Sequence, residues 1–594
     1  MKPPFYRRYL LITILCAVFG LATVIQMIRI NYTPFAQNLI AKSEDYRGVK
    51  KTIYPPRGTI YDRKGNILAT NQIGYEVGID LKHVIDPETL AFAASSLLDE
   101  LDYLHVFALA STEKRVDENR YFVLSSYVSK EKIEELENLK ESYATRRREE
   151  KSLKPNLSGL VWTPMYQRTY PEGTLAANVL GFYNYFSREN AQGVFGVEEA
   201  YNRLLTGKPL TVFMPNDPYL VEALPDIDPG ASLILTIDRE IQKMLEVTLE
   251  EALKWSGGEG GAIIVADPKT GEILGMASTP FFNPNEYWKY NETFPGITPY
   301  NRAVGTAYEP GSVFKVITMA AALDSGAADL NTTYNDTSGV YWVANTWPIY
   351  NWNYGAWGVQ DMTGCMQYSL NVCLAHIAID LLGEELFYDY LQAFGFGRST
   401  GIDLANEANY PLRLPDNNQW VIMDLATNSF GQGIAVTPIQ MVTAVSAIAN
   451  DGRMMTPHVV RGVIDKGQQY NVSPQVINNP ISAQTARDLT EMLAISLEEE
   501  SSDALVEGYR VAGKTGTGQI PTELGYTSTL TNASFVGWGP ADDPQFVVYV
   551  WIEKPTISQW GSEVASPIFS KVVKQLVVLM RIPPDNIRKQ LASD

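Results

Sequence analysis

Three short motifs in the second half of the chain could together perform nucleophilic catalysis. The first, Ser312-Val-Phe-Lys315, follows a Pro-Gly turn and begins a long apolar run that predicts a buried helix. Side chains three positions apart share one face of a helix, so the serine hydroxyl and the lysine amine would be neighbours. A serine needs a base to take its proton. A lysine can be that base where burial and a nearby positive charge keep it neutral.

The other two motifs offer groups that could relay protons and bind a peptide. Ser369-Leu-Asn371 supplies a second hydroxyl, and an amide that can both donate to and accept from a peptide backbone. Lys514-Thr515-Gly516-Thr517 fits a strand whose lysine and threonines could hold a substrate carboxylate, while its glycine permits close backbone approach. An adjacent backbone N–H could stabilise an oxyanion, and one such donor contributes about 2.7–4 kcal/mol.

Order and local context separate these motifs from chance matches elsewhere in the chain. Ser129-Lys-Glu-Lys132 also fits S-x-x-K, but it lies in a charged segment with no preceding turn. Lys269-Thr-Gly271 also fits K-T-G, but it follows Asp-Pro as in a hairpin turn and precedes the nucleophile. Ser312 has no G-x-S-x-G elbow around it and no histidine close in sequence, so the local signature of an α/β-hydrolase is missing.

The segments around the motifs predict a domain of mixed helices and antiparallel strands. Residues 232–238 fit a strand, residues 239–256 an amphipathic helix, and residues 261–278 two strands joined by a turn. A closing helix is expected at residues 566–582. With the helical middle of the chain, this order predicts an α+β fold with a mixed helix–sheet core.

The N-terminal half predicts further short strands and helices. Residues 52–80 fit strands, with a polar hairpin turn from Asp62 to Asn66. Residues 87–102 begin with proline and have helical apolar spacing, and residues 129–154 predict an exposed, charged helix.

The composition indicates a folded protein without a nucleic-acid partner. Of the 594 residues 45% are hydrophobic, and a net charge of −19 does not fit phosphate binding, which needs concentrated Lys and Arg.

Cys16, Cys365 and Cys373 show no metal-ligand spacing, so we expect no metal and no cofactor. Cys365 and Cys373 could pair in an oxidising compartment, but on one helix their separation would be about 12 Å, too far for a disulfide. We therefore expect no disulfide framework.

The apolar stretch Tyr9–Ile28 predicts a single membrane-spanning helix. Twenty residues rise about 30 Å, which is the thickness of the hydrocarbon layer. Lys2, Arg7 and Arg8 precede the stretch and predict a cytoplasmic N-terminus; a cleaved signal peptide or a buried core helix is the alternative. The expected organisation is a cytoplasmic segment at 1–8, a membrane helix at 9–28, and, outside the cytoplasm, a non-catalytic domain at 31–225 and a catalytic domain at 230–585.

At these motifs the chain resembles class B penicillin-binding proteins, and the resemblance extends over nearly its whole length. RGTIYDRKGNILA at 57–69, RTYPEGTLAANVLGF at 168–182 and GVFGVEEAYNRLLTG at 193–207 look like the family's N-terminal motifs. FGQGIAVTPIQMVTAVSAIANDG at 430–452 and NASFVGWGPADDP at 532–544 are similar to blocks of its catalytic domain. The resemblance implies an elongated α+β pedestal of the dimerisation type and a transpeptidase domain with the serine β-lactamase-like fold.

Carried over position by position, the resemblance implies a serine D,D-transpeptidase that cross-links peptidoglycan stem peptides and is acylated by β-lactam antibiotics. Ser312 would be the nucleophile, Lys315 its general base and Ser369 a proton relay. Backbone N–H groups of Ser312 and Thr517 would form the oxyanion hole. The residues that the resemblance assigns are the catalytic Ser312, Lys315, Ser369 and Lys514 and the substrate-binding Asn371, Thr515, Gly516 and Thr517.

Two details bear on the subtype. The segment EPGSVFK and the ADDP block look more like division-type than elongation-type members. The resemblance then implies a polytopic SEDS-family glycosyltransferase and other divisome or elongasome membrane proteins as partners, bound through the membrane helix and the pedestal. Leu370 stands where β-lactamases often carry Asp, which favours a penicillin-binding protein.

The Tyr- and Trp-rich stretch at 341–358 departs from the family pattern. We favour core packing or a structured loop over a role in lining the cleft or contacting glycan.

Other functions fit parts of this pattern. A DD-carboxypeptidase or a β-lactamase would share the acylation step but activate water, and no motif for a water-activating glutamate is evident. A β-lactam sensor would need a cytoplasmic effector, and only about eight residues precede the apolar helix. A scaffold without activity is disfavoured by the intact Ser312, Lys315, Ser369 and Lys514.

Overall fold

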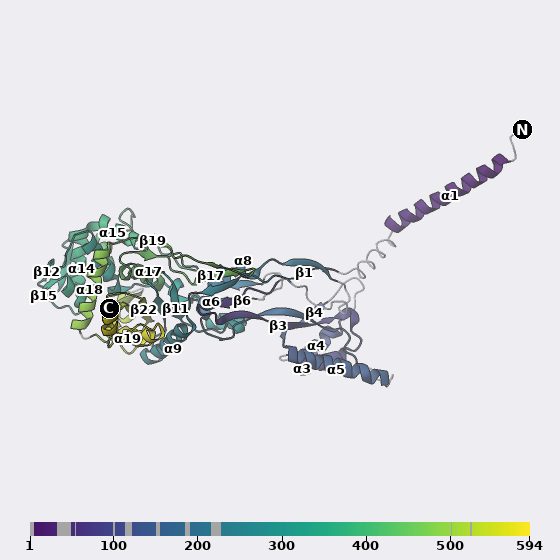
Figure 1. The fold of residues 1–594 in the computed structure, drawn as a ribbon, viewed down its shortest axis with the longest axis horizontal. Helices are drawn as coiled ribbons and strands as arrows, with labels where there is room; N and C mark the ends of the chain where they lie inside the picture. The colour runs from purple at the N-terminus through teal and green to yellow at the C-terminus, as the bar shows by residue number, and fades with distance from the viewer. Residues whose placement is uncertain are drawn as a thin grey trace. The chain divides into compact units, whose positions relative to one another are not determined.

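A computed structural model describes most of the chain (Figure 1), namely residues 5–32, 49–53, 55–98, 101–112, 121–149, 155–184, 191–214, 227–500, 502–522 and 525–593. The chain forms two compact units, each made of three separate segments. The smaller unit comprises Met1–Pro56, Ile73–Met165 and Thr206–Pro229, and the larger comprises Arg57–Gln72, Tyr166–Leu205 and Gly230–Asp594. The family-like motifs near residues 57, 168 and 193 therefore belong to the larger unit, apart from Thr206 and Gly207 at the end of the third motif. The boundary expected at residue 225 lies outside the described residues.

The N-terminal helix α1 (Phe5–Tyr32) is apolar along most of its length. Its segment Arg8–Ile30 has a mean hydropathy of 2.4, and none of it is buried within the protein. Among the described residues it is the only helix that is long and apolar enough to cross a membrane. The predicted single membrane-spanning segment lies inside it.

The smaller unit contains the helices expected from the N-terminal half. Asp86 caps α3 (Pro87–Leu97) by accepting a hydrogen bond from the Thr89 N–H, and Pro87 occupies the first turn, where it displaces no helical hydrogen bond. The charged segment forms α5 (Lys130–Glu149). Both helices are confirmed, but the first ends at Leu97, before the expected residue 102. Their apolar sides meet in one core that includes Leu90 and Leu136, each fully buried.

The predicted polar hairpin turn connects β2 (Ile60–Tyr61) to β3 (Ile67–Asp80). The Asp62 carboxylate accepts from the backbone N–H groups of Lys64 (2.8 Å) and Asn66 (2.7 Å). An aspartate that binds its own downstream backbone is a typical turn device, so this prediction is confirmed. On its other side β2 pairs in parallel with β9 (Ser232–Leu235).

A buried ion-pair network joins the N-terminal motifs within the larger unit. The Glu198 carboxylate, fully buried, binds Arg57 at 2.6 Å and Arg168 at 2.7 Å, and also accepts from the Tyr170 hydroxyl at 3.0 Å. Burial alone would raise the pKa of Glu198, but the two guanidinium groups outweigh it and lower that pKa. The three motifs near residues 57, 168 and 193 thus share one electrostatic centre.

An antiparallel five-stranded sheet organises the larger unit, in the order β11-β10-β22-β21-β20. These strands are Ile273–Ser278, Gly260–Ala266, Phe546–Glu553, Gly525–Gly539 and Ala512–Thr522. Alternate side chains of β10 enter two different cores: Ile263 and Val265 belong to one, and Ala262 and Ile264 to the other. The sheet is therefore covered on both faces.

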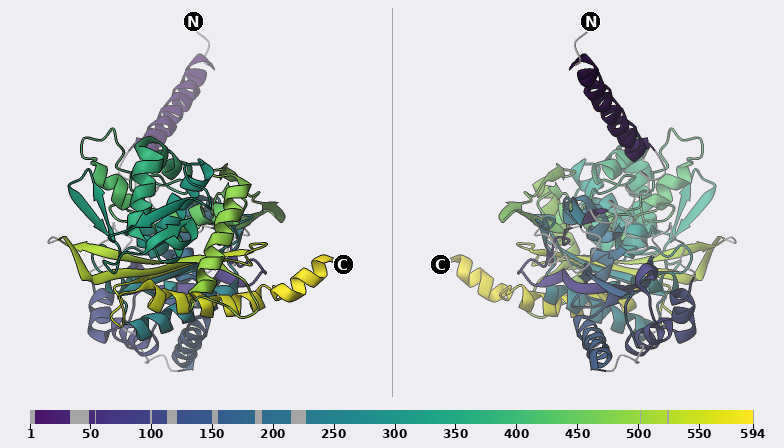
Figure 2. Two further views of the ribbon diagram at one scale, coloured as in Figure 1. Left: turned by 90° about the vertical axis from the view of Figure 1, so that its left-hand side faces the viewer. Right: turned by 90° about the vertical axis from the view of Figure 1, so that its right-hand side faces the viewer.

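Helices α9 (Arg239–Ser256) and α19 (Gly561–Leu579) cover one face of this sheet. A cluster that includes α12 (Lys315–Asp324), α17 (Pro438–Ala449) and α18 (Ala483–Glu499) covers the other (Figure 2). Every residue of α17 is buried, as expected of a helix that is apolar all round. The predicted α+β fold is confirmed.

The C-terminal end differs in detail from the prediction. Helix α19 begins at Gly561, earlier than the expected residue 566, and carries Pro567 in its interior. A further helix, α20 (Asp585–Ser593), follows it and was not expected.

Candidate active site

The turn that carries the predicted nucleophile Ser312, here called the nucleophile turn, leads directly into a buried helix. Ser312 lies in the short 3-10 helix η4 (Gly311–Phe314), and Lys315 is the first residue of α12. The Lys315 N–H donates to the Ser312 carbonyl, so the two residues are one tight turn apart. Lys315 is fully buried, whereas Ser312 is half-buried.

Glycines let three backbone segments meet at this turn. A Cβ atom at Gly516 would lie 2.4 Å from Ser534 Oγ, and one at Gly311 would lie 2.4 Å from the Thr517 carbonyl oxygen. A Cβ at Gly431 would lie 2.1 Å from the Gly311 carbonyl oxygen. The Gly311 N–H in turn donates to the Gly431 carbonyl at 3.0 Å. Strand β20 and the segment at residue 431 therefore press against the nucleophile turn with no room for a side chain between them.

The Lys315 amine links the first motif to the second. Its Nζ donates to the Ser369 carbonyl at 2.7 Å and to Asn371 Oδ1 at 2.8 Å, and lies 3.1 Å from Ser369 Oγ. Burial, and then the positive charge of Lys514, lower the pKa of Lys315 well below its ordinary value. A neutral amine in this position can accept a proton, and its two N–H bonds suffice for the carbonyl and the amide oxygen.

Lys514 supplies a second buried cation beside the third motif. It lies on β20, is 5% exposed, and places Nζ 3.2 Å from Thr515 Oγ1. Burial lowers its pKa to about 8, while Glu500 opposes the shift. At neutral pH Lys514 is therefore mostly charged and can attract a carboxylate.

Thr515 and Thr517 lie two residues apart on β20, so their side chains point to the same face of the strand. Both are half-buried, while Gly516 between them is buried. Thr517 Oγ1 accepts a hydrogen bond from the Gly561 N–H at 3.0 Å, so its own proton is available for a ligand. These hydroxyls and the Lys514 ammonium can together hold an anionic group.

Ser369 occupies a sharp turn between α13 (Met362–Gln367) and α14 (Asn371–His376). Its φ of 53° lies in the left-handed region, which residues other than glycine rarely adopt. The turn places the Ser369 carbonyl and hydroxyl toward Lys315 while Asn371 begins the next helix.

The same turn overturns the expectation that Cys365 and Cys373 lie too far apart for a disulfide. Cys365 lies on α13 and Cys373 on α14, and the two form a disulfide with their Cα atoms 6.1 Å apart. The expectation failed because it placed both cysteines on one helix, whereas the chain reverses at Ser369. The bond brackets the second motif, and both cysteines are fully buried.

We expect removal of this disulfide to weaken the larger unit. Replacing Cys365 and Cys373 together with alanine should lower its free energy of unfolding by about 2.5 kcal/mol, the entropy of a loop of this length. Denaturant unfolding of the double variant beside the oxidised wild type measures the loss. Cys16→Ala, outside the disulfide, is the control; equal unfolding midpoints for the double variant and the control would contradict the prediction.

We expect acylation by a penicillin to have a bell-shaped pH dependence. The rate is expected to rise on the acid side as Lys315 loses its proton, because only a neutral amine could accept a proton from Ser312. It falls again at about pH 8, where Lys514 loses the charge that attracts the drug carboxylate. Stopped-flow acylation rates measure both limbs. Lys514→Arg stays charged, so an alkaline limb that persists in this variant would show that Lys514 does not cause it.

The structure also places residues beside the motifs that the sequence did not assign. The Tyr350 carbonyl accepts from Asn371 Nδ2 at 3.0 Å, and Asn351, which is buried, accepts from the Val372 N–H at 3.3 Å. Trp352 Nε1 donates to the Tyr368 carbonyl at 3.1 Å. The aromatic composition at 341–358 was the available signal. The structured loop expected beside core packing fits the paired strands at Val340–Val343 and Trp347–Tyr350. Core packing is wrong for five of the rings, which are 43–75% exposed: Trp342, Trp347, Tyr350, Trp352 and Tyr354.

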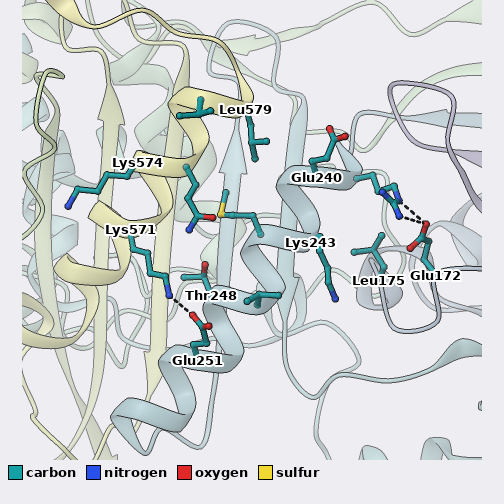
Figure 3. Close-up of a pocket in the computed structure, with 14 residues that line it drawn as sticks. Glu172, Leu175, Glu240, Lys243, Thr248, Glu251, Lys571, Lys574 and Leu579 are labelled. Atoms are coloured by element: carbon teal, nitrogen blue, oxygen red, sulfur yellow. Dashed lines mark hydrogen bonds and ion pairs between the residues drawn. The ribbon is translucent and has the colours of Figure 1, made fainter.

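A separate pocket of about 750 Å³ lies along α9 and α19 (Figure 3). Leu175, Met244 and Leu579 contribute apolar walls, and the Lys571–Glu251 and Arg239–Glu172 ion pairs lie in its lining. None of the motif residues lines it, so this pocket is distinct from the candidate active site. No cluster of His, Cys, Asp and Glu that could hold a metal ion occurs among the described residues.

Comparisons with known proteins agree with this site and fold. The penicillin-binding protein transpeptidase domain matches residues 261–574, and the penicillin-binding protein dimerisation domain matches residues 52–213. Stage V sporulation protein D of Bacillus subtilis (strain 168) is 32% identical over 576 residues, covering 94% of this chain and 83% of the relative. Peptidoglycan D,D-transpeptidase FtsI of Escherichia coli (strain K12) is 26% identical over 585 residues, covering 96% of this chain and 92% of the relative.

Solved structures share the fold. Penicillin-binding protein 2X from Streptococcus thermophilus superimposes with a TM-score of 0.73 at 23% identity, covering 89% of this chain and 80% of that one. Penicillin-binding protein 3 from Mycobacterium tuberculosis, crystallised with ampicillin, gives a TM-score of 0.66 at 23% identity, covering 90% and 97%.

This chain belongs to the class B penicillin-binding proteins, with a transpeptidase domain and a dimerisation domain. Its enzyme class is that of the peptidoglycan D,D-transpeptidases.

Proposed function

We propose that Ser312 is the residue acylated in D,D-transpeptidation and that Lys315 is its general base. The observation that carries this proposal is the Lys315 amine. It is fully buried, has a depressed pKa, and is held one turn from Ser312 by Ser369 and Asn371. A base poised near the working pH is what an otherwise weak serine nucleophile requires.

The proposed reaction proceeds in two halves. Ser312 Oγ attacks the carbonyl of the penultimate D-Ala while Lys315 takes the hydroxyl proton, and the backbone N–H groups of Ser312 and Thr517 stabilise the oxyanion. The tetrahedral intermediate collapses, the C–N bond breaks, and terminal D-Ala leaves with a proton relayed through Ser369. An amine from a neighbouring stem then attacks the ester, restores the Ser312 hydroxyl and forms the cross-link.

The donor peptide is oriented by groups on both sides of the nucleophile. The Lys514 ammonium and the hydroxyls of Thr515 and Thr517 bind the terminal carboxylate. The two threonines share one face of β20, and Lys514 Nζ lies 3.2 Å from Thr515 Oγ1, which supports this assignment. The Asn371 amide binds the peptide backbone. A β-lactam offers a matching carboxylate and a strained amide, so it acylates the same serine.

The experiment that tests this function is intact-protein mass spectrometry after incubation with a penicillin. A stable adduct of one drug per chain supports the transpeptidase. Drug that is consumed without an adduct would instead identify a hydrolase of the β-lactamase or carboxypeptidase kind. Drug that stays intact without an adduct would refute acylation altogether.

The proposed location places the N-terminus in the cytoplasm and the catalytic unit outside it, anchored by α1. The basic residues before the apolar segment support this orientation, as does a disulfide, which persists in oxidising compartments. A polytopic SEDS-family glycosyltransferase is the proposed partner, bound through the membrane helix and the pedestal.

The proposed role is in septal wall synthesis, supported by the division-like segment EPGSVFK and the similarity to FtsI. The most identical of the relatives described above carries a sporulation name, which makes a spore-wall role the second candidate. A fluorescent fusion imaged in dividing cells and in sporulating cells decides between them. Signal along the side wall would contradict both.

A further inference from the structure

The aromatic stretch after the first motif forms a hairpin with two unlike faces. Strands β13 (Val340–Val343) and β14 (Trp347–Tyr350) pair antiparallel. Val343 and Ile349, 1% and 8% exposed, pack in one small core with helix α14. Because side chains alternate along a strand, Trp342 and Tyr350 point to the opposite face, where they are 54% and 43% exposed.

One further ring lies against this exposed face. Tyr354, 75% exposed, contacts the Tyr350 ring with centroids 5.3 Å apart. Trp342 lies diagonally across the hairpin from Tyr350, a separation of roughly 7–8 Å. The hairpin core is already filled by Val343 and Ile349, so these rings are not needed for packing. A group of exposed aromatic rings of this kind is typical of a binding site.

Hydrogen bonds make this surface continuous with the candidate active site. The Tyr350 carbonyl accepts from Asn371 Nδ2, and the same amide accepts from Lys315 Nζ. Trp352 donates to the Tyr368 carbonyl, one residue before Ser369.

The Trp352 ring also reaches the other side of the motifs. It contacts the Trp560 ring edge-to-face at 5.6 Å and 74°. Trp560 immediately precedes Gly561, whose N–H donates to Thr517 Oγ1. The rings of this surface therefore extend from the second motif to the third.

We propose that this surface, here called the aromatic platform (Trp342, Tyr350, Trp352, Tyr354 and Trp560), binds sugar rings of the glycan strand that carries the stem peptide. This inference rests on the proposed transpeptidase function. A pyranose ring has a face of C–H bonds and a rim of hydroxyls. The rings of Trp and Tyr match it with an apolar face and a polar edge.

The length of the stem peptide agrees with this placement. Four residues precede the attacked carbonyl, and an extended chain of four spans at most about 14 Å. The sugar that carries the peptide must therefore lie within that distance of Ser312. The Tyr350 carbonyl is joined to the Lys315 amine by two hydrogen bonds of 3.0 and 2.8 Å through Asn371, so the backbone that carries the platform lies close to the second motif.

The test compares two competitors that differ only in sugar. One is a disaccharide-pentapeptide and the other is the same pentapeptide without sugar. The experiment measures how strongly each competitor slows acylation of the full-length, detergent-solubilised protein by a fluorescent penicillin. For every variant, the inhibition constant is calculated relative to the acylation rate of that same variant without competitor. We expect the wild type to bind the sugar-bearing ligand about tenfold more tightly than the free pentapeptide, because stacking on exposed rings contributes a binding free energy that corresponds to about this factor.

The double variant Trp342→Ala, Tyr354→Ala is expected to bring the ratio of the two inhibition constants close to one. Trp342→Phe, which keeps a ring, should retain part of the preference. Trp255→Ala is the matched control, because Trp255 is 50% exposed on α9 and outside the platform. Equal binding of the two ligands by the wild type, or an unchanged ratio in the double variant, would overturn the proposal. Failure of the transpeptidase function itself would appear separately, as the absence of any penicillin adduct.

Discussion

Ser312→Ala is expected to abolish covalent capture of penicillin, with no adduct detectable by intact-protein mass. The hydroxyl is the proposed nucleophile, and no other group can take over the bond that it forms. The fold should survive, because Ser312 is half-buried and its removal leaves the buried Lys315 amine bound to Ser369 and Asn371. Circular dichroism and unfolding midpoints close to wild type check that second part.

The chain offers a matched control for this experiment. Ser129 stands in the same S-x-x-K spacing before Lys132, but it lies on the surface at the start of α5, where its hydroxyl accepts from the Lys132 N–H at 3.4 Å. Ser129→Ala should acquire the adduct at the wild-type rate. Drug retained covalently on Ser312→Ala would refute the assignment of the nucleophile.

Glu198→Ala is expected to lower the free energy of unfolding by about 3–5 kcal/mol, which is more than the loss expected from removing the disulfide. Removing this carboxylate takes away an ion pair from each of the Arg57 and Arg168 guanidinium groups, which are only 5% and 4% exposed. Because the pKa of Glu198 is lowered in the folded state, its contribution is present at neutral pH and is lost as the pH falls through that lowered pKa.

Denaturant unfolding at neutral pH measures this loss, and Glu251→Ala serves as its control. Glu251 pairs with Lys571 on the surface, where both side chains are about half exposed. Such pairs contribute about 0–1 kcal/mol. A Glu198→Ala protein that unfolds at the same denaturant concentration as Glu251→Ala would show that the buried network is not a main source of stability.

Periodicity and turn chemistry predicted much of the fold, because these signals are local. The Asp62–Asn66 turn, the helix that begins at Pro87 and the paired strands around residue 270 follow from short stretches of sequence. The strand order of the five-stranded sheet depends on contacts between distant segments and could not be predicted in this way. The three-segment composition of each unit has the same origin.

The candidate site was predicted as three motifs, and the structure brings Lys315, Ser369, Asn371 and Lys514 close together. What the sequence could not provide is the turn at Ser369. A serine with a left-handed backbone conformation between two helices has no distinctive local sequence pattern. On one continuous helix, without this turn, Cys365 and Cys373 would lie too far apart to form a disulfide. Trp560 and Gly561 were missed for a similar reason, because only the tertiary fold places them beside β20.

The glycines around the nucleophile turn restrict how such an enzyme can acquire drug resistance. A Cβ atom at Gly311, Gly431, Gly516 or Gly561 would lie 2.1–2.4 Å from another segment. Substitution there would move Ser312 or β20 and would disable wall synthesis together with drug binding. Selection by antibiotics is therefore expected to act at other positions around the motifs, where polar contacts such as that between the Gln432 and Gln519 side chains (3.2 Å) join neighbouring segments. Variants that survive treatment are expected to keep these four glycines and to change residues around them.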